Sequence, residues 1–149
     1  MGKMLFVFAV AMMLATSPAR AASSGAPADV PGMAEATKLI EQEKYADAVP
    51  HLKTANEKVP TNADVLNLLG YSHRKLGKFD EAHDYYERAL KIDAKHKGAL
   101  NYLGQLYLET GRPEKAKEML ARLDKACTFG CKEYDWLKQA VASGKAGKY

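Results

Sequence analysis

Two cysteines are the residues of this chain whose type and spacing most directly allow chemistry. Cys127 and Cys131 stand four residues apart in Ala-Cys-Thr-Phe-Gly-Cys, with Gly130 placed to end one helix before the next begins. In an oxidising compartment such a pair across a turn favours a structural disulfide, which contributes about 2 kcal/mol for so short a loop. The alternative is a thiol–disulfide redox site, although the spacing is not Cys-x-x-Cys and only a nearby helix start would make either thiol reactive.

Other catalytic and metal-binding signatures are absent from the sequence. It has no Cys-x-x-Cys-His, no glycine-rich phosphate loop, no Gly-x-Ser-x-Gly and no His-Glu-x-x-His. The histidines have no metal-ligand spacing with the cysteine pair, and we expect each at the surface or in a groove. They are His51, His73, His83 and His96. The sequence therefore predicts no enzyme activity, no cofactor, no metal and no small-molecule substrate.

The N-terminus has the pattern of a secretory signal peptide. Lys3 precedes an apolar run of twelve residues, Met4 to Ala15, and Ala19-Arg20-Ala21 fits a small-residue cleavage site. The run is short for crossing about 30 Å of hydrocarbon, so cleavage after Ala21 is favoured over an uncleaved membrane anchor. No cysteine lies near the site, which excludes lipid attachment there. We therefore expect residues 1–21 to be a signal peptide and the chain to be exported, in a bacterium to the periplasm.

Cleavage would also change the charge of the chain. The mature protein would lose Lys3 and Arg20 but no acidic residue, so the net charge falls from +4 to 20 − 18 = +2. Nucleic-acid-binding proteins cluster their basic residues, whereas here Lys alternates with Glu and Asp, and we expect no nucleic-acid partner. Residues 22–32 are rich in small residues, Pro and Gly, which predicts a flexible lead-in.

Beyond the lead-in the chain repeats with a period of 34 residues. Residues 44–48 (Lys-Tyr-Ala-Asp-Ala) align with residues 78–82 (Lys-Phe-Asp-Glu-Ala), and the Leu-Gly pair at 69–70 recurs at 103–104. This period, with helical spacing inside each unit, predicts an array of helix–turn–helix units. The expected helices cover residues 33–43, 46–58, 62–76, 79–92, 96–110, 113–126 and 131–143.

Several residues in these helices have expected roles in packing. Gly70 and Gly104 fall inside helices, where Gly costs about 1 kcal/mol against Ala, so we expect close packing there against Ala82 and Ala116. Pro50 should remove one hydrogen bond and bend its helix. The last helix, 131–143, is amphipathic and is expected to cap the end of the stack.

The repeat resembles the tetratricopeptide (TPR) family. Residues 63–96 match its pattern at Leu66, Leu69, Gly70, Ala82, Tyr86 and Ala89. Residues 97–130 match at Leu100, Leu103, Gly104, Tyr107, Ala116 and Leu120. Residues 29–62 form a degenerate copy. The resemblance implies an all-α fold, a right-handed superhelix of helical hairpins with about three repeats. The TPR domain would cover residues 33–143, including the capping helix 131–143, followed by a tail at 144–149.

The resemblance also implies a concave groove lined by the first helix of each hairpin. In the second repeat the groove-facing residues would be Asp64, Asn67, Tyr71, Arg74 and Lys75. In the third repeat they would be Gly98, Asn101, Gln105, Leu108 and Glu109. Amides such as Asn67 and Asn101 can both donate to and accept from a peptide backbone, although a solvated helix face is the alternative. Some family members bind a C-terminal carboxylate, but Leu68 and Tyr102 occupy two of the places needed, so that clamp is not expected.

A non-enzymatic binding protein is the function that these patterns favour. We expect a periplasmic adaptor or assembly factor that holds a peptide or helix of a partner protein in the groove. The alternatives are a redox protein using Cys127 and Cys131, and self-association through the degenerate first repeat.

Overall fold

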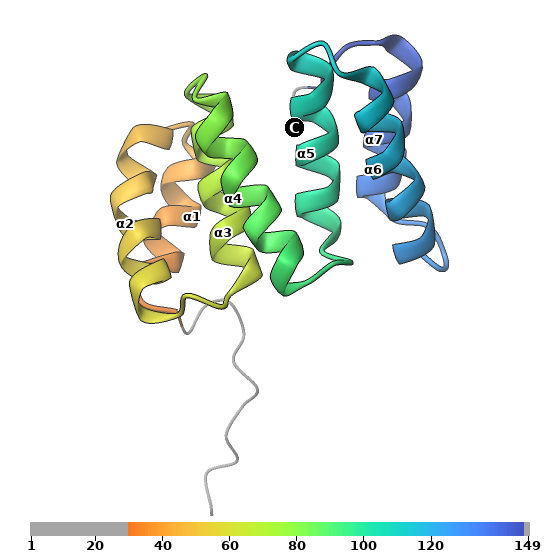
Figure 1. Ribbon diagram of the computed structural model, residues 1–149. Coiled ribbons are helices and arrows are strands. Elements are labelled where there is room, and N and C mark those ends of the chain that lie inside the picture. The colour runs from red at the N-terminus through yellow and green to blue at the C-terminus, as the bar shows by residue number, and fades with distance from the viewer. Residues whose placement is uncertain (1–29, 148–149) are drawn as a thin grey trace, which may run out of the picture.

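The computed structural model describes residues 30–147. Within this range the chain forms α-helices and no β-strand (Figure 1). The helices are α1 (Met33–Glu41), α2 (Tyr45–Lys58), α3 (Ala63–Lys75), α4 (Phe79–Ile92), α5 (Lys97–Glu109), α6 (Pro113–Ala126) and α7 (Lys132–Ser143). The predicted signal peptide, residues 22–29 of the predicted lead-in and residues 148–149 lie outside the described residues. Between residues 30 and 147 no helix is long and apolar enough to cross a membrane.

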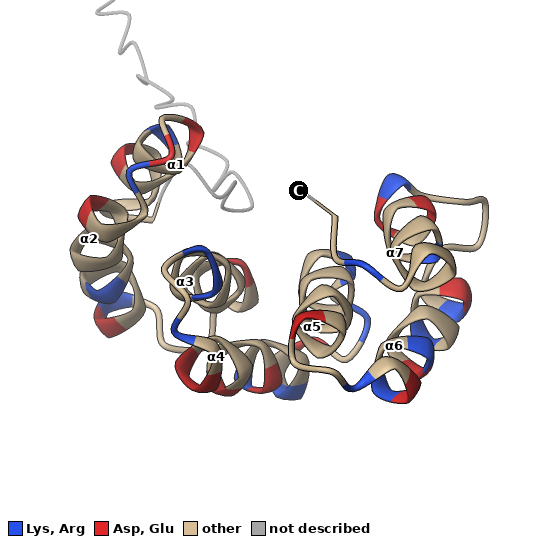
Figure 2. Ribbon diagram, turned by 90° about the horizontal axis from the view of Figure 1, so that it is seen from above, with Lys and Arg blue, Asp and Glu red and all other residues tan. Residues whose placement is uncertain are grey.

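The helices pair into antiparallel hairpins that stack side by side. The hairpins are α1/α2, α3/α4 and α5/α6, and α7 packs on both α5 and α6. Seen from above, α1, α3 and α5 lie on the inner side of a curve and α2, α4 and α6 on the outer side (Figure 2). Basic and acidic residues are interspersed over these helices (Figure 2). The predicted all-α stack of helical hairpins is confirmed, and no predicted helix end differs by more than two residues from the observed one.

Local sequence signals explain where the helices begin and end. The Asn62 side chain accepts a hydrogen bond from the backbone N–H of Val65 at 3.1 Å, which caps the start of α3. Gly77 (φ 74°) and Gly111 (φ 70°) follow α3 and α5 in the left-handed conformation that glycine adopts without strain. Pro50 lies inside α2, which continues through it as one helix.

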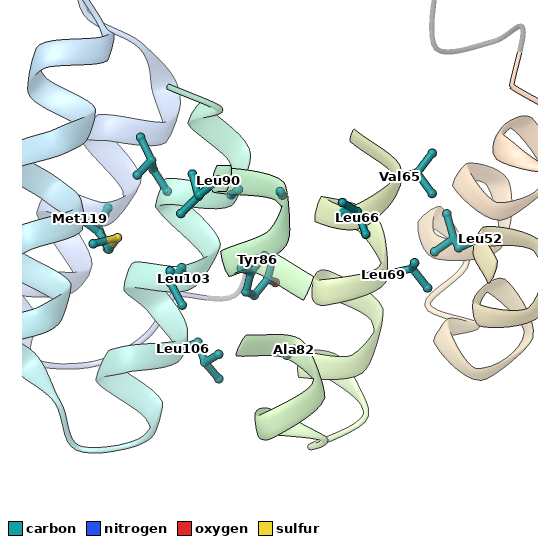
Figure 3. Packing of buried hydrophobic residues seen from close by; sticks show 14 of the residues in the cluster. Leu52, Val65, Leu66, Leu69, Ala82, Tyr86, Leu90, Leu103, Leu106 and Met119 are labelled. Carbon is teal, nitrogen blue, oxygen red and sulfur yellow. The ribbon is translucent and has the colours of Figure 1, made fainter. Parts of the chain in front are cut away.

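The core consists of aliphatic residues and alanines at equivalent places in successive hairpins. Between α2 and α3, Leu52 packs beside Val65 and Leu69 (Figure 3). Tyr86 of α4 is fully buried in the middle of the stack. Burial of a Leu or aromatic side chain contributes about 1.5–3 kcal/mol, so these contacts hold neighbouring hairpins together.

Gly70 and Gly104 allow close packing, but against larger residues than expected. A Cβ atom at Gly70 would lie 2.6 Å from Cε1 of Tyr86, and one at Gly104 would lie 2.6 Å from Cδ2 of Leu137. The missing side chain therefore makes room for an aromatic ring in one case and for the capping helix in the other. The atoms nearest these glycines therefore belong to Tyr86 and Leu137 and not to the expected Ala82 and Ala116.

The capping helix is joined to the third hairpin by a disulfide. Cys127 and Cys131 are bonded, with their Cα atoms 5.7 Å apart, at the end of α6 and just before α7. The loop that they close presents a fully exposed Phe129. From α7, Leu137 is fully buried against the stack, so the bond links two elements that are also packed together.

Candidate peptide-binding groove

Three tyrosines form a cluster where the inner helices α3 and α5 meet. The ring centroid of Tyr71, on α3, lies 4.8 Å from that of Tyr102, on α5, and 5.8 Å from that of Tyr45, the first residue of α2. The Lys75 ammonium lies 5.3 Å from the centroid of the Tyr71 ring, a cation–π distance. All three tyrosines are partly exposed. This tyrosine cluster (Tyr45, Tyr71 and Tyr102) is therefore an aromatic surface shared by three hairpins.

The environment of the cluster keeps the hydroxyls of Tyr71 and Tyr102 neutral by raising the pKa of each. Burial raises the pKa of Tyr71, and the neighbouring Tyr45 raises it further. Burial also raises the pKa of Tyr102. For Lys75, burial and then the charge of Arg74 lower the pKa. Neutral phenol groups can both donate and accept hydrogen bonds, so the cluster offers polar atoms as well as aromatic faces.

Arg74 and Glu109 form a two-pronged ion pair between α3 and α5. Arg74 Nε lies 2.8 Å from Glu109 Oε2, and Arg74 Nη2 lies 2.9 Å from Oε1. The side chains are 2% and 28% exposed. Burial works to lower the pKa of Arg74, but the hydrogen bonds and charge of Glu109 and the nearby Tyr86 and Tyr71 outweigh it, so that pKa rises. Both residues were expected to face the groove; the structure instead places the guanidinium inside, where it joins the two helices.

The amide side chains predicted for the groove are buried. Asn67 is 7% exposed, and a Cβ at Gly98 would lie 3.0 Å from its Nδ2. Asn101 and Gln105 are fully buried, and Gln105 Nε2 donates to Asn101 Oδ1 at 3.3 Å. Gln105 Oε1 accepts a hydrogen bond from the backbone N–H of Gly147 at 2.7 Å. Because both asparagines are enclosed, the alternative of a solvated helix face is wrong for them.

Asn67 and Asn101 each have one buried side-chain atom that makes no hydrogen bond within the described part of the chain. Within the described residues, Asn67 Oδ1 and Asn101 Nδ2 are buried without a hydrogen-bond partner. Most buried side-chain polar atoms in proteins have a partner. These two unpaired atoms lie at equivalent positions of α3 and α5, 34 residues apart in the repeat.

The remaining predicted residues lie around the cluster. Asp64 Oδ1 accepts a hydrogen bond at 3.0 Å from Nε2 of His96, whose Nδ1 accepts from the backbone N–H of Ala99. This contact links the starts of α3 and α5. Leu108 is partly buried against the core. The expectation of a surface or groove position was wrong for His73, which is buried, with Nδ1 2.8 Å from the Leu69 carbonyl oxygen.

Sequence reasoning missed two members of the tyrosine cluster. Tyr102 was considered only as a residue that occupies a clamp position, and Tyr45 only as part of the repeat pattern. The signal that could have identified them is the placement of Tyr71, Tyr102 and Tyr45 on consecutive hairpins whose inner helices are neighbours. Among residues 30–147, no group of three or more His, Cys, Asp or Glu side chains is arranged to hold a metal ion.

Comparison with known protein families identifies the family to which this chain belongs. Two models described as tetratricopeptide repeat match the chain, one over residues 33–96 and one over residues 73–126. Together they cover residues 33–126, which is 94 of 149 residues. The chain belongs to the tetratricopeptide-repeat family. No curated protein sequence matches this TPR protein.

Solved structures of TPR domains share its fold at low sequence identity. The TPR2B domain of yeast Sti1 in a pHsp70 complex has a TM-score of 0.69 and 16% identity, over 76% of this chain and 95% of that one. The Yersinia enterocolitica type III secretion chaperone SycD, with a peptide of the translocator YopD, has a TM-score of 0.65 and 19% identity, over 74% and 84%. The first TPR of Spaghetti (RPAP3), bound to the HSP90 peptide SRMEEVD, has a TM-score of 0.63 and 19% identity, over 73% and 89%.

Proposed function

We propose that this TPR protein is a non-enzymatic adaptor or assembly factor that holds an extended segment of a partner protein against the inner faces of α3 and α5. The observation that carries the proposal is the tyrosine cluster. Tyrosine gives a large, rigid contact area at a low cost in conformational entropy and is enriched among the residues that dominate binding energy. The TPR domains of Spaghetti, Sti1 and SycD, whose structures contain HSP90, pHsp70 and YopD partners, support the same use of the fold.

The charged residues near the tyrosine cluster indicate which kind of partner segment it would bind. Arg74 is already paired with Glu109, and Asp64 accepts a hydrogen bond from His96, so these two charged side chains are engaged within the protein. Leu68 and Tyr102 stand at positions where a carboxylate clamp would need polar groups. We therefore expect a segment with an aromatic or aliphatic side chain to contact the tyrosine cluster.

Photo-cross-linking in living cells tests this proposal. The photoreactive residue p-benzoylphenylalanine would replace Tyr71 in the cluster or, as a matched control, Tyr85, which is also partly buried but lies on the outer helix α4. We expect one specific adduct with a partner from position 71 and none from position 85. Adducts only from position 85, or from neither position in a folded protein, would refute binding at the inner face.

We further propose that the chain is exported to a bacterial periplasm and works there. The basic start, the apolar run Met4–Ala15 and the small residues up to Ala21 support export, and a disulfide such as Cys127–Cys131 is stable in that compartment. N-terminal sequencing of the protein from a periplasmic extract should begin at Ala22. Recovery only from the cytoplasm with Met1 intact would contradict the proposal.

A further inference from the structure

The C-terminal segment, residues 144–147, turns back from α7 onto the inner helix α5. Gly144 ends α7 in the left-handed conformation (φ 68°), and the Lys145 N–H bonds to the Ala140 carbonyl oxygen at 3.2 Å. The chain then reaches α5, where the Gly147 N–H donates to Gln105 Oε1 at 2.7 Å. This contact joins residues 42 positions apart. Ala146 and Gly147 are both partly buried, so the segment packs on the body of the protein.

Gln105 is held in the orientation that this contact requires. Its Nε2 donates to Asn101 Oδ1 at 3.3 Å, which leaves Oε1 as the acceptor for a backbone N–H. Gln105 is fully buried, and Asn101 Nδ2 has no hydrogen-bond partner among the described residues. A buried amide accepting a backbone N–H, beside an unused amide donor, is an arrangement suited to a peptide backbone.

We propose that residues 145–147 are an intramolecular ligand of this groove, which a partner segment must displace before it can bind along α5. The proposal rests on the proposed function, because it adds regulation to the same site. It also defines one subsite: Gln105 accepts a backbone N–H from an extended segment of small residues, as it accepts one from Gly147 here, and Asn101 orients the Gln105 amide. The partner's apparent affinity is then reduced in proportion to the fraction of molecules whose groove is free.

The expected size of the effect follows from the contact itself. One ordinary hydrogen bond contributes a net factor of roughly two to ten in an equilibrium constant. Tethering places the segment at an effective concentration in the millimolar range. We therefore expect removal of the segment to strengthen partner binding by about three- to tenfold, with free peptide binding only at about millimolar concentration.

Backbone relaxation of the ¹⁵N-labelled full chain tests whether the segment is bound. We expect order parameters at residues 145–147 close to the rigid value of about 0.85, and values below about 0.6 in Gln105→Leu. Gln42→Leu, which changes an exposed glutamine at the end of α1, is the matched control and should leave them unchanged. Order parameters below about 0.6 in the unmodified chain would overturn the proposal.

A truncated chain that ends at Gly144 tests whether residues 145–147 compete with a free peptide for Gln105, and it leaves the core unchanged. The probe is the synthetic peptide Ser-Gly-Lys-Ala-Gly-Lys-Tyr, which corresponds to residues 143–149. We expect it to shift the Gln105 side-chain amide signals of the truncated chain, and to bind the full chain at least about threefold more weakly. The same peptide with N-methylglycine in place of Gly147 lacks the donated N–H and should cause no shift at Gln105. Equal binding to both chains, or equal binding of both peptides, would refute the proposal.

Photo-cross-linking from position 71 separates this proposal from the proposed function. If the truncated chain yields more partner adduct than the full chain at equal concentration, both stand. If the two chains yield equal adduct, the intramolecular ligand is refuted and partner binding remains. If neither yields adduct while relaxation shows a bound segment, the proposed function fails and competition with a partner fails with it.

Discussion

Replacing Glu109 by alanine isolates the ion pair that joins the two helices of the groove. The change leaves the Arg74 guanidinium, whose side chain is 2% exposed, without its carboxylate partner. Removing one member of a buried ion pair costs about 3–5 kcal/mol, because the other charge stays desolvated. The Glu109 side chain is 28% exposed, so water can reach part of the site. We therefore expect the free energy of unfolding to fall by about 3 kcal/mol.

Urea denaturation followed by circular dichroism at 222 nm measures this loss. With a slope of about 2 kcal/mol per molar urea, the midpoint should fall by about 1.5 M while the slope stays the same. The matched control is Glu114→Ala in the pair with Lys117, whose 2.8 Å contact is just as short but whose side chains are 79% and 56% exposed. That variant should lose less than about 1 kcal/mol. A loss for Glu109→Ala no larger than the control would refute the reasoning.

Further predictions concern the glycine contacts, the disulfide and the buried tyrosine. Gly70→Ala brings a methyl group to 2.6 Å from the Tyr86 ring, so overpacking should outweigh helix propensity and lower the free energy of unfolding by about 1–2 kcal/mol. Gly104→Ala meets flexible leucine methyl groups and should lower it by less than about 1 kcal/mol. Urea denaturation measures both changes. Replacing Cys127 and Cys131 by serine should cost about 2 kcal/mol, and a reducing agent should then have no further effect. Burial raises the pKa of Tyr86, so above about pH 10 this tyrosine ionises in the unfolded chain before it ionises in the folded one. The free energy of unfolding should therefore fall as the pH rises above that value, and it should fall less steeply in Tyr86→Phe.

Helix positions could be predicted from this sequence because local signals repeat in register. The 34-residue period places each hairpin, and residues such as Asn62, Gly77 and Pro113 mark helix ends by their own conformational preferences. These signals depend on neighbours close in sequence. For that reason α4 and α6 were predicted with their observed bounds.

Burial in the groove could not be predicted in the same way, because it depends on contacts outside the repeat. The repeat register placed Arg74 and Gln105 on the inner helices, but it carried no information on the carboxylate 35 positions away that pairs with Arg74. Nor did it indicate that Gly147 would reach Gln105. The packing of Leu137 on Gly104 likewise comes from the capping helix, which has no counterpart in the repeat pattern used to choose the alanine partners.

Measured affinity for the cross-linked partner segment tests the central claim, that the tyrosine cluster binds a partner. Isothermal titration of that segment would compare the unmodified chain with Tyr71→Ala/Tyr102→Ala and with the outer-face control Tyr85→Ala, each checked for folding by circular dichroism. Aromatic residues at the centre of an interface dominate binding, so the double variant should bind at least about tenfold more weakly and the control within about twofold of the unmodified chain. Equal affinity of the double variant and the unmodified chain would contradict the account.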